Sequence, residues 1–394
     1  MHGFEGRRIW LVGIGGAGLS AYALLARAWG AQVGGWDRSE TPYLGPVRDA
    51  GIEVRVSAQP EAPAGWEVFV SSAYPAAPGR PRAALLVELV DAAPSIVVAG
   101  AHGKTTTAAM VAFALRETGR DPSWVVGGEV PQLGANAGAG KGWLVVEGDE
   151  SDRSVFQLRP RVAVVTNVDL DHHSEFGSRA EVENLFEHWL AEVPEVVRGR
   201  ELEPLQGELA VPGDHNRRNA AAAAAAVELA GVPRDEAVKA LASFGGVSRR
   251  FELVGSAGGI EVYDDYAHNP EKVRAAIATA RERSRGRVLV LFQPHLYSRT
   301  LHSYRELGRE LAAADVVAIT DVYPAREQPL PGVTGKLVVD ALCDARPGLA
   351  PGWAPTIEHG VRFLARRARP GDLALTVGAG DVDGAAQLLL EELG

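Results

Sequence analysis

Cysteine and lysine are both scarce in this chain of 394 residues. The single cysteine, Cys343, excludes an internal disulfide and any metal site built from several thiolates. Lysine occurs only at positions 104, 141, 239, 272 and 336, so each lysine can be judged singly for a role in binding. No uninterrupted apolar run has the length of a membrane span, and the first residues lack the basic and apolar regions of a signal peptide. The sequence therefore predicts a cytoplasmic protein with no membrane partner.

The charge balance of the chain is acidic, with 50 Asp and Glu residues against 40 Lys and Arg residues. The resulting formal net charge of -10 argues against a broad nucleic-acid surface, although a local basic pocket for an anionic ligand remains compatible with it. A hydrophobic content of 46% and a charged content of 23% are typical of a globular protein. Because the chain is too long for one core, we expect two or three domains, in a monomer or homodimer that binds no nucleic acid.

A glycine-rich loop follows an apolar, β-branched run in the first half of the chain. Residues 95–98 predict a buried strand, residues 99–107 have the sequence AGAHGKTTT, and residues 108–116 predict a helix. A strand, a glycine turn and a helix that opens with Lys-Thr form a phosphate cradle, because backbone N–H groups and the helix dipole face the anion. Lys104 is placed to reach terminal phosphates, and a threonine hydroxyl is placed to hold Mg²⁺. Val98 stands where the full Walker pattern has glycine, so the loop is a shortened variant.

A second glycine motif, GIGGAG at 13–18, lies near the N-terminus between a predicted strand at 8–12 and a predicted helix. Asp37 ends the next predicted strand, where a ribose-binding acid belongs. Taken alone, this domain favours a nicotinamide oxidoreductase. The safer inference is a loop that binds a diphosphate, and the second nucleotide loop makes hydride transfer a less complete explanation.

Strand-like and helical runs alternate along the chain, which predicts α/β units with parallel sheets. A turn-rich stretch near 91–94 predicts the first domain boundary, and Gly245-Gly246 predicts a hinge or linker. Beyond it the pattern restarts with predicted strands at 260–264, 287–292, 316–320 and 373–377. We therefore expect three α/β domains, at 1–93, 94–246 and 247–394.

Acidic residues follow two predicted strands of the middle segment, at 147–152 (EGDESD) and 166–173 (TNVDLDHH). Carboxylates at strand ends near a phosphate loop suit Mg²⁺, although a solvated acidic turn is the alternative for the first group. Asn216 and Asn219 open an alanine-rich helix and are three residues apart, so they share a face that can bond an adenine edge.

Two loops of the last segment carry His, Arg and Tyr. The sequence DDYAHNP at 264–270 follows one predicted strand, and FQPHLYSRT at 292–300 ends another. Strand-end loops of this composition predict a pocket for an acidic substrate, although each loop alone is also consistent with a purely structural role.

In this order, the blocks resemble the Mur ligases of peptidoglycan synthesis, and the resemblance covers nearly the whole chain. GIGGAGLS at 13–20 resembles the family's UDP-sugar diphosphate loop, AHGKTTT at 101–107 its ATP loop, and GDESD at 148–152 the stretch with its metal acid. The FQPHLYSRT and DESD blocks are the most discriminating, and VYPAREQP at 322–329 completes the series. The resemblance implies a Rossmann-like N-terminal domain for the UDP substrate, a P-loop central ATPase domain and a Rossmann-like C-terminal domain.

The resemblance is strongest to the alanine-adding branch and implies ATP-dependent amide formation with Mg²⁺. The lactyl carboxylate of UDP-N-acetylmuramate would attack the γ-phosphorus of ATP, and the amino group of L-alanine would then displace phosphate from the acyl phosphate. The implied catalytic residues are Lys104, Glu150, His172, His268 and Arg299. The implied metal ligands are Thr105, Glu150 and His172.

The resemblance also implies binding residues for each substrate. Those for ATP are Gly100, His102, Gly103, Lys104, Thr105, Thr106, Asn216, Asn219, Arg250 and Asp265. Those for the UDP substrate are Gly15, Gly16, Ala17, Gly18, Ser20, Asp37, Ser72, His102 and Asn136. Those for the amino acid are Tyr266, His268 and Arg299.

Three features bear on the branch of the family. No lysine lies between Lys141 and Lys239, so the carbamylated lysine of relatives that add later amino acids has no counterpart. The stretch from 190 to 211 is much shorter than usual, which makes the central domain a trimmed one. Leu296 and Asn269 stand where many alanine-adding enzymes have Arg and a second His. The open alternatives are a ligase that attaches a preformed peptide to the same UDP sugar, a ligase for another carboxylate such as a folate, an oxidoreductase, and a non-catalytic nucleotide-binding protein.

Overall fold

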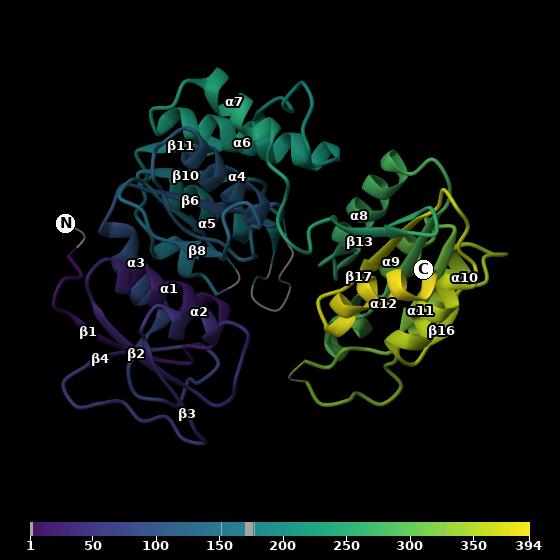
Figure 1. Ribbon diagram of the computed structural model, residues 1–394, viewed down its shortest axis with the longest axis horizontal. Helices are drawn as coiled ribbons and strands as arrows, with labels where there is room; N and C mark the ends of the chain where they lie inside the picture. The colour runs from purple at the N-terminus through teal and green to yellow at the C-terminus, as the bar shows by residue number, and fades with distance from the viewer. Residues whose placement is uncertain (1–2, 151, 170–175, 177, 326) are drawn as a thin grey trace. The chain divides into compact units, whose positions relative to one another are not determined.

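The computed structural model describes residues 3–150, 152–169, 176, 178–325 and 327–394. The chain divides into two compact units, which are described separately below. The first unit comprises residues 1–211 and 216–245, and the second comprises residues 212–215 and 246–394. The first contains two β-sheets and the second contains one (Figure 1).

The N-terminal sheet is fully parallel, with the strand order β3-β2-β1-β4-β5. Its central strand carries the buried run Ile9–Val12, as expected for a strand that is covered on both faces. The strands are β1 (Arg8–Val12), β2 (Gln32–Asp37), β3 (Glu53–Val56), β4 (Glu67–Val70) and β5 (Arg80–Pro81). The helices are α1 (Ala17–Ala28), α2 (Leu44–Asp49) and α3 (Arg82–Asp91).

The second sheet of this unit has the order β11-β10-β6-β9-β7-β8 and is parallel except for β8. Its strands are β6 (Ser95–Ala99), β7 (Ser123–Val125), β8 (Ala137–Gly138), β9 (Leu144–Glu147), β10 (Val162–Val165) and β11 (Glu195–Arg198). Its helices are α4 (Lys104–Glu117), α5 (Arg179–Leu190), α6 (Asp214–Leu229) and α7 (Arg234–Ala242), with 3₁₀ turns η1 (Ser154–Gln157) and η2 (Gly199–Glu201).

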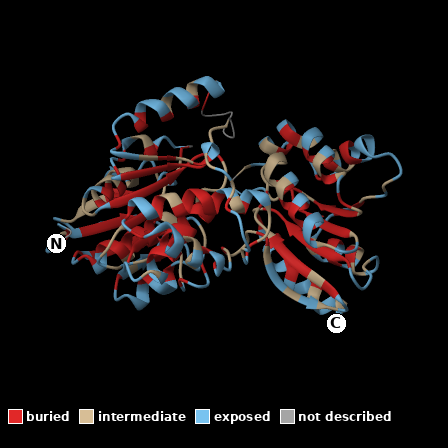
Figure 2. Cartoon of the chain, turned by 90° about the horizontal axis from the view of Figure 1, so that it is seen from above, coloured by how far each residue is buried: buried red, intermediate tan, exposed pale blue. Residues whose placement is uncertain are grey.

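One hydrophobic core joins the two sheets of the first unit. Leu19 and Leu25 of α1, Leu85 of α3, and Val125 and Val146 of the second sheet belong to the same buried cluster. Helix α1 contacts β2 of the first sheet and β7 and β8 of the second. The helix that the glycine loop opens therefore packs against elements of both sheets, and Figure 2 shows buried strands at the centre of this unit.

The two helices nearest the phosphate loop, α4 and α6, are rich in small side chains and are largely buried. All residues of α4 from Thr105 to Leu115 are buried, so this helix has no polar face to give it an amphipathic pattern. In α6, the alanines at 220–224 and 226 are buried and allow close packing, and the helix itself confirms the predicted alanine-rich helix. Helix α4 begins at Lys104, which confirms the predicted helix that opens with Lys-Thr and extends the helical run predicted at 108–116. Gly103, in the left-handed conformation, serves as its N-cap.

The sheet of the second unit has the order β12-β13-β17-β14-β15-β16, and only β12 is antiparallel. Apolar clusters cover both of its faces. Its strands are β12 (Glu252–Ala257), β13 (Ile260–Asp265), β14 (Val288–Phe292), β15 (Val316–Thr320), β16 (Gly352–Ala354) and β17 (Leu373–Val377). Its helices are α8 (Pro270–Arg283), α9 (Tyr297–Leu311), α10 (Lys336–Ala345), α11 (Ile357–Ala365) and α12 (Ala385–Leu393), with a 3₁₀ turn η3 (Asp381–Gly384).

These sheets confirm the predicted α/β class with mainly parallel strands. The hairpin β12–β13 was missed, although Gly258 and Gly259 form its two-residue turn with φ angles of 57° and 77°. The chain passes from one unit to the other at Gly245-Gly246, and the division at 93/94 stays a prediction. Among the described residues, every helix falls short of the length and apolar character needed to span a membrane.

Candidate active site

The phosphate loop, Gly100–Gly103, connects β6 to α4 in the first unit. Gly100 has a φ of 124°, and a Cβ there would lie 2.5 Å from the carbonyl oxygen of Asn167 and the hydroxyl of Thr166. Gly103 has a φ of 80°, and a Cβ there would lie 2.4 Å from Oδ1 of Asn219. Both positions therefore require glycine for conformation and for space, which is how a loop brings its backbone close to a ligand.

The end of β10 fixes the shape of this loop. The backbone N–H of His102 donates to Oδ1 of Asn167 at 3.0 Å, and Nδ2 of Asn167 donates back to the carbonyl of His102 at 2.8 Å. The hydroxyl of Thr166 donates to the same carbonyl at 2.6 Å. One asparagine thus satisfies both backbone groups of a loop residue, which pre-organises the loop for an anion.

Lys104 is the first residue of α4, and its ammonium group lies at the centre of the loop. Nζ donates to the carbonyl of Gly100 at 2.7 Å and lies 3.0 Å from both carboxylate oxygens of Glu150. Glu150 is only 2% exposed, so a buried carboxylate and a half-buried ammonium form a close ion pair. The structure thus brings together two of the five predicted catalytic residues.

A second carboxylate reaches the loop from the end of β9. Oε1 of Glu147 accepts a hydrogen bond from the hydroxyl of Thr105 at 2.9 Å, and Oε2 accepts one from the N–H of Gly127 at 2.6 Å. Thr105 and its neighbour Thr106 are both buried in the first turn of α4. Glu147 therefore orients the hydroxyl that the sequence predicts as a metal ligand.

The predicted adenine contacts, Asn216 and Asn219, lie on one face of α6. Both are buried, and Nδ2 of Asn219 donates to Oδ1 of Asn216 at 3.3 Å. Asn219 also lies against Gly103, so the structure brings this pair to the phosphate loop.

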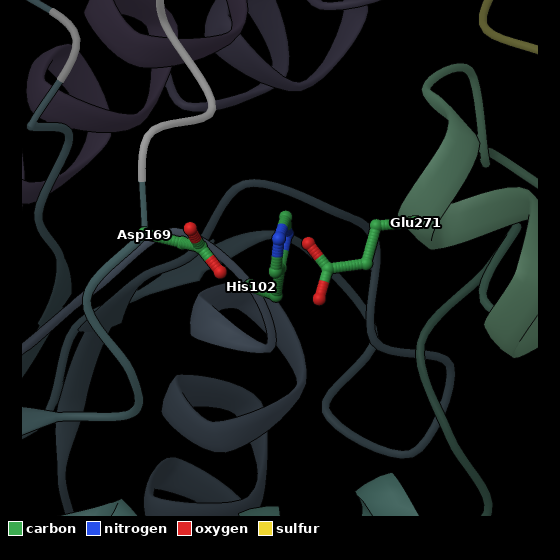
Figure 3. A group of neighbouring side chains, drawn as sticks. All are labelled: His102, Asp169 and Glu271. Carbon is green, nitrogen blue, oxygen red and sulfur yellow. The ribbon is translucent and has the colours of Figure 1, made fainter. Parts of the chain in front are cut away.

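The TNVDLDHH block is only partly described. Asp169 lies near His102, with ligand atoms within 4.8 Å of one another, and Figure 3 shows the imidazole and carboxylate side by side. Figure 3 also labels Glu271, which lies in the first turn of α8 in the other unit. His172, predicted as a catalytic residue and metal ligand, lies outside the described residues, as do Asp171 and His173 of the same block, Ser151 of EGDESD and Arg326 of VYPAREQP.

The N-terminal glycine loop connects β1 to α1. Asp37 is 6% exposed, and its carboxylate accepts hydrogen bonds from the N–H of Gly15 at 2.7 Å, the N–H of Arg38 at 2.7 Å and the hydroxyl of Tyr74 at 3.0 Å. The predicted ribose-binding acid therefore orders the loop, and its contact with a ribose stays a prediction.

The other predicted contacts of the UDP substrate surround this loop or lie farther along the unit. Gly16 is exposed, whereas Ala17 and Gly18 are half-buried in the first turn of α1. Ser20 is buried and donates its hydroxyl to the carbonyl of Ala17 at 3.1 Å. Ser72 is exposed just after β4, and Asn136 is half-buried just before β8.

In the second unit, the hairpin β12–β13 brings residues 249–251 (Arg-Arg-Phe) beside the loop DDYAHNP at 264–270. Asp265 accepts the N–H groups of Phe251 and Ala267, both at 2.8 Å. Burial raises the pKa of Asp265 to about 6, against the opposing effects of Arg250 and these backbone donors. The guanidinium of Arg250 lies 5.3 Å from the ring centre of Tyr266, a cation–π distance.

The predicted amino-acid contacts of this unit also form a group. The imidazole of His268 donates from Nδ1 to the carbonyl of Tyr266 at 2.9 Å and lies 6.0 Å from the ring of His295. Arg299 donates to Nδ1 of His295 at 3.3 Å. Burial lowers the pKa of His268 well below 6.5, and the cations Lys272 and Arg299 act in the same direction. Burial and Arg299 also lower the pKa of His295, so both rings are neutral at pH 7.

The sequence alone indicates no individual role for four residues near these sites: Glu147, Asn167, His295 and Arg82. The first three stand inside motifs that were recognised, but their hydrogen-bond partners are distant in sequence. Arg82 opens α3 outside every recognised motif.

Comparison with known proteins gives two domain matches and full-length relatives. Residues 98–197 match the Mur ligase middle domain, and residues 249–380 match the Mur ligase, glutamate ligase domain. The UDP-N-acetylmuramate--L-alanine ligase of Rubrobacter xylanophilus is 36% identical over 446 residues, covering 98% of this chain and 100% of that protein. The chain belongs to the Mur ligase family.

Other relatives agree with this assignment. The protein of the same name from Kineococcus radiotolerans is 40% identical over 95% of this Mur ligase and 94% of its own length. Among solved structures, the UDP-N-acetylmuramate-alanine ligase of Thermotoga maritima superposes with a TM-score of 0.80 at 26% identity, covering 98% of each chain. A murein peptide ligase from Psychrobacter arcticus shares the fold, with a TM-score of 0.65 at 23% identity over 99% of each chain. The family favours the ligase over the oxidoreductase alternative for the glycine loop.

Proposed function

We propose that this Mur ligase uses ATP to join the amino group of L-alanine to the lactyl carboxylate of UDP-N-acetylmuramate. The observation that carries the proposal is the Lys104–Glu150 pair inside a glycine loop whose backbone groups are fixed by Asn167. It stands in a chain that is 36 to 40% identical, over nearly its whole length, to ligases named for this reaction. We expect the enzyme to act in the cytoplasm.

The proposed reaction has two steps. A carboxylate oxygen of the sugar attacks the γ-phosphorus of ATP, the bond from that phosphorus to the bridging oxygen breaks, and ADP leaves. The amino nitrogen of alanine, after losing a proton, then attacks the acyl carbon, and the acyl C–O bond breaks to release phosphate. The first step brings two anions together, so positive charge and N–H donors are needed between them.

Lys104 and the phosphate loop supply that charge and those donors. The ammonium group of Lys104 now bonds the carbonyl of Gly100 and the carboxylate of Glu150, and the phosphates of ATP would compete for it. The positive end of α4 adds a fixed dipole at the same place. Asn216 and Asn219 stand beside the loop and would hold the adenine.

The residues around Lys104 also fit magnesium. A threonine hydroxyl and a buried carboxylate are the oxygen ligands that Mg²⁺ prefers, so Thr105 and Glu150 would hold it, together with His172 as the family resemblance implies. When bound, Mg²⁺ would neutralise part of the charge on the ATP phosphates. Glu147 would keep the Thr105 hydroxyl in place through the hydrogen bond between them.

The second unit would bind the amino acid through His268, Arg299 and Tyr266. Because Nδ1 of His268 donates to a backbone carbonyl, the neutral ring keeps a lone pair on Nε2. That nitrogen would accept a hydrogen bond from the ammonium group of alanine, and the Arg299 guanidinium would bind its carboxylate.

The test is product formation from purified chain, ATP, Mg²⁺ and UDP-N-acetylmuramate, with and without L-alanine, followed by phosphate release and mass spectrometry. The proposal expects phosphate release that requires both substrates and a product with the mass of UDP-N-acetylmuramoyl-alanine. Release that needs the UDP sugar but takes a peptide instead of alanine would reassign the second substrate. Absence of release would favour another carboxylate substrate or a binding-only protein.

A further inference from the structure

Arg82 lies against the glycine loop that would bind the nucleotide sugar. It is the first residue of α3, and its Nη1 atom would be 3.0 Å from a Cβ built at Gly18, in the first turn of α1. Its guanidinium therefore occupies the space beside Gly18 that a side chain at that position would fill. Sheet topology explains this position. Strand β5 pairs in parallel with β4, and α3 begins directly after it, so Arg82 lies at the carboxyl edge of the sheet, where the glycine loop after β1 also lies.

A carboxylate from the loop after β9 holds the guanidinium in place. Nη2 of Arg82 donates to Oδ2 of Asp152 at 2.7 Å, and the two side chains are 27% and 32% exposed. Asp152 is itself fixed, because its Oδ1 accepts the N–H of Ser154 at 3.0 Å. Since an arginine has five N–H donors in a rigid fork, the bond to Asp152 leaves donors for a second anion.

The loop itself offers backbone groups but no cation. Residues 13–22, GIGGAGLSAY, contain no charged side chain. Tyr22 adds no charge, since burial raises its pKa to about 12. A diphosphate bound there would meet N–H groups and the dipole of α1 from the loop, and a full positive charge from Arg82.

We propose that Arg82 is a substrate-binding residue that contacts the diphosphate of the nucleotide sugar, with Asp152 as its positioning residue. The inference rests on the proposed function, because it takes a UDP sugar as the ligand of the glycine loop. The Arg82–Asp152 bond would also link the nucleotide-sugar site of the first sheet to the phosphate site of the second. Asp152 follows Glu150 by two residues, so one side chain touches both the diphosphate loop and the acidic loop beside Lys104.

The experiment measures binding by calorimetry without ATP, using UDP-N-acetylmuramate and UDP-N-acetylglucosamine. The two ligands share the uridine diphosphate, but only the first has the lactyl carboxylate. The variants are Arg82→Met, Arg82→Lys and the control Arg80→Met. Arg80 stands two residues earlier, is half exposed, and is also ion-paired, to Glu88 at 2.6 Å. Thermal unfolding of each variant verifies that it is folded.

We expect Arg82→Met to bind both UDP sugars about 10- to 100-fold more weakly than the wild type, the range for a lost charge-assisted hydrogen bond. The affinity of Arg82→Lys should lie between those of Arg82→Met and the wild type, because lysine keeps the positive charge but lacks the planar guanidinium with its several donors. The affinity of Arg80→Met should match that of the wild type. Equal affinity of Arg82→Met and the wild type would overturn the proposal and leave the proposed function intact. A loss confined to UDP-N-acetylmuramate would place Arg82 at the carboxylate and overturn the diphosphate assignment. A wild type that binds neither sugar would overturn the proposed function itself.

Discussion

The side-chain carboxamide of Asn219 lies against the Cα atom of Gly103, so close that a Cβ at residue 103 would be 2.4 Å from Oδ1. This contact joins α6 to the phosphate loop across more than a hundred residues of sequence. The position of Asn219, the predicted adenine contact, therefore depends on residue 103 being a glycine.

The substitution Gly103→Ala is therefore expected to weaken ATP binding. The methyl group would displace Asn219 and strain a backbone with a φ of 80°, a conformation that costs a non-glycine residue about 1–2 kcal/mol. We predict a KM for ATP raised at least about 10-fold, the equivalent of roughly 1.4 kcal/mol of binding energy. The matched control is Gly119→Ala, where φ is 73° but nothing lies within 4 Å of the added atom. If both variants show the same KM, the contact with Asn219 has no part in ATP binding.

Lys104→Met should abolish most of the turnover while leaving the nucleotide-sugar site intact. Removing one pre-organised cation from the phosphate loop is expected to lower kcat at least about 100-fold, in line with the loss of a single oxyanion donor. Calorimetry should find unchanged affinity for UDP-N-acetylmuramate, because the glycine loop of α1 is a separate structure. Lys239→Met, on the exposed surface of α7, serves as control. More than a tenth of the wild-type kcat in Lys104→Met would contradict the role of the ammonium group.

The ring of His268 should titrate well below pH 6.5, because burial and the cations Lys272 and Arg299 disfavour its charged form. Protonation then costs more in the folded than in the unfolded chain, so this group lowers stability as the pH falls below 6.5. NMR titration of the imidazole measures its midpoint directly. Lys272→Met should move the midpoint upward, toward 6.5. A wild-type midpoint at or above 6.5 would rule out the neutral ring as the acceptor of an ammonium group.

Asp372 anchors the start of β17 in the second unit. It accepts from Nη2 of Arg287 at 2.7 Å and from the N–H of Arg369 at 2.8 Å. Burial raises the pKa of Asp372, but the hydrogen bonds from Arg287 and Arg369 outweigh it, and the pKa lies below its ordinary value. Its stabilisation is therefore complete above about pH 4 and is lost as the pH falls through the lowered pKa.

Asp372→Asn should consequently lower the free energy of unfolding by about 1.5–3 kcal/mol at pH 7, the range for hydrogen bonds to a charged group. Urea unfolding at pH 7 and pH 3 measures the difference, which should shrink in acid. Glu261→Gln, which removes a surface pair with Arg283 at 3.5 Å, should cost at most about 1 kcal/mol at either pH. If Asp372→Asn lowers the free energy of unfolding equally at pH 7 and pH 3, the stabilisation by Asp372 does not come from its charge.

The sequence predicted the strands of all three sheets best where β-branched residues are buried on both faces, as in Ser95–Ala99. It predicted a helix that opens with Lys-Thr, as α4 does, although the three threonines after Lys104 hide the apolar helix pattern until residue 108. It also predicted that the acids after the strands of the middle segment lie near the phosphate loop. Parallel strands have their carboxyl ends at the same edge of a sheet, so the residues that follow them are neighbours.

The sequence did not predict which acid meets which partner. Glu147 was part of a recognised motif, yet only the folded chain shows that it bonds the hydroxyl of Thr105 and the N–H of Gly127. Arg82 had no sequence signal, because its role depends on α3 packing beside α1 and on a carboxylate seventy residues away. Side-chain pairings between elements are set by tertiary packing, which periodicity and motif spacing do not encode.

The most direct test of the account follows one oxygen atom through the reaction. UDP-N-acetylmuramate labelled with ¹⁸O in both lactyl carboxylate oxygens is incubated with the enzyme, ATP, Mg²⁺ and L-alanine, and the released phosphate is analysed by mass spectrometry. Because the carboxylate attacks the γ-phosphorus and the acyl C–O bond later breaks, each phosphate should carry one ¹⁸O atom and the amide product should keep the other. Unlabelled phosphate released alongside the amide product would contradict an acyl phosphate, and with it the role assigned to the Lys104 site.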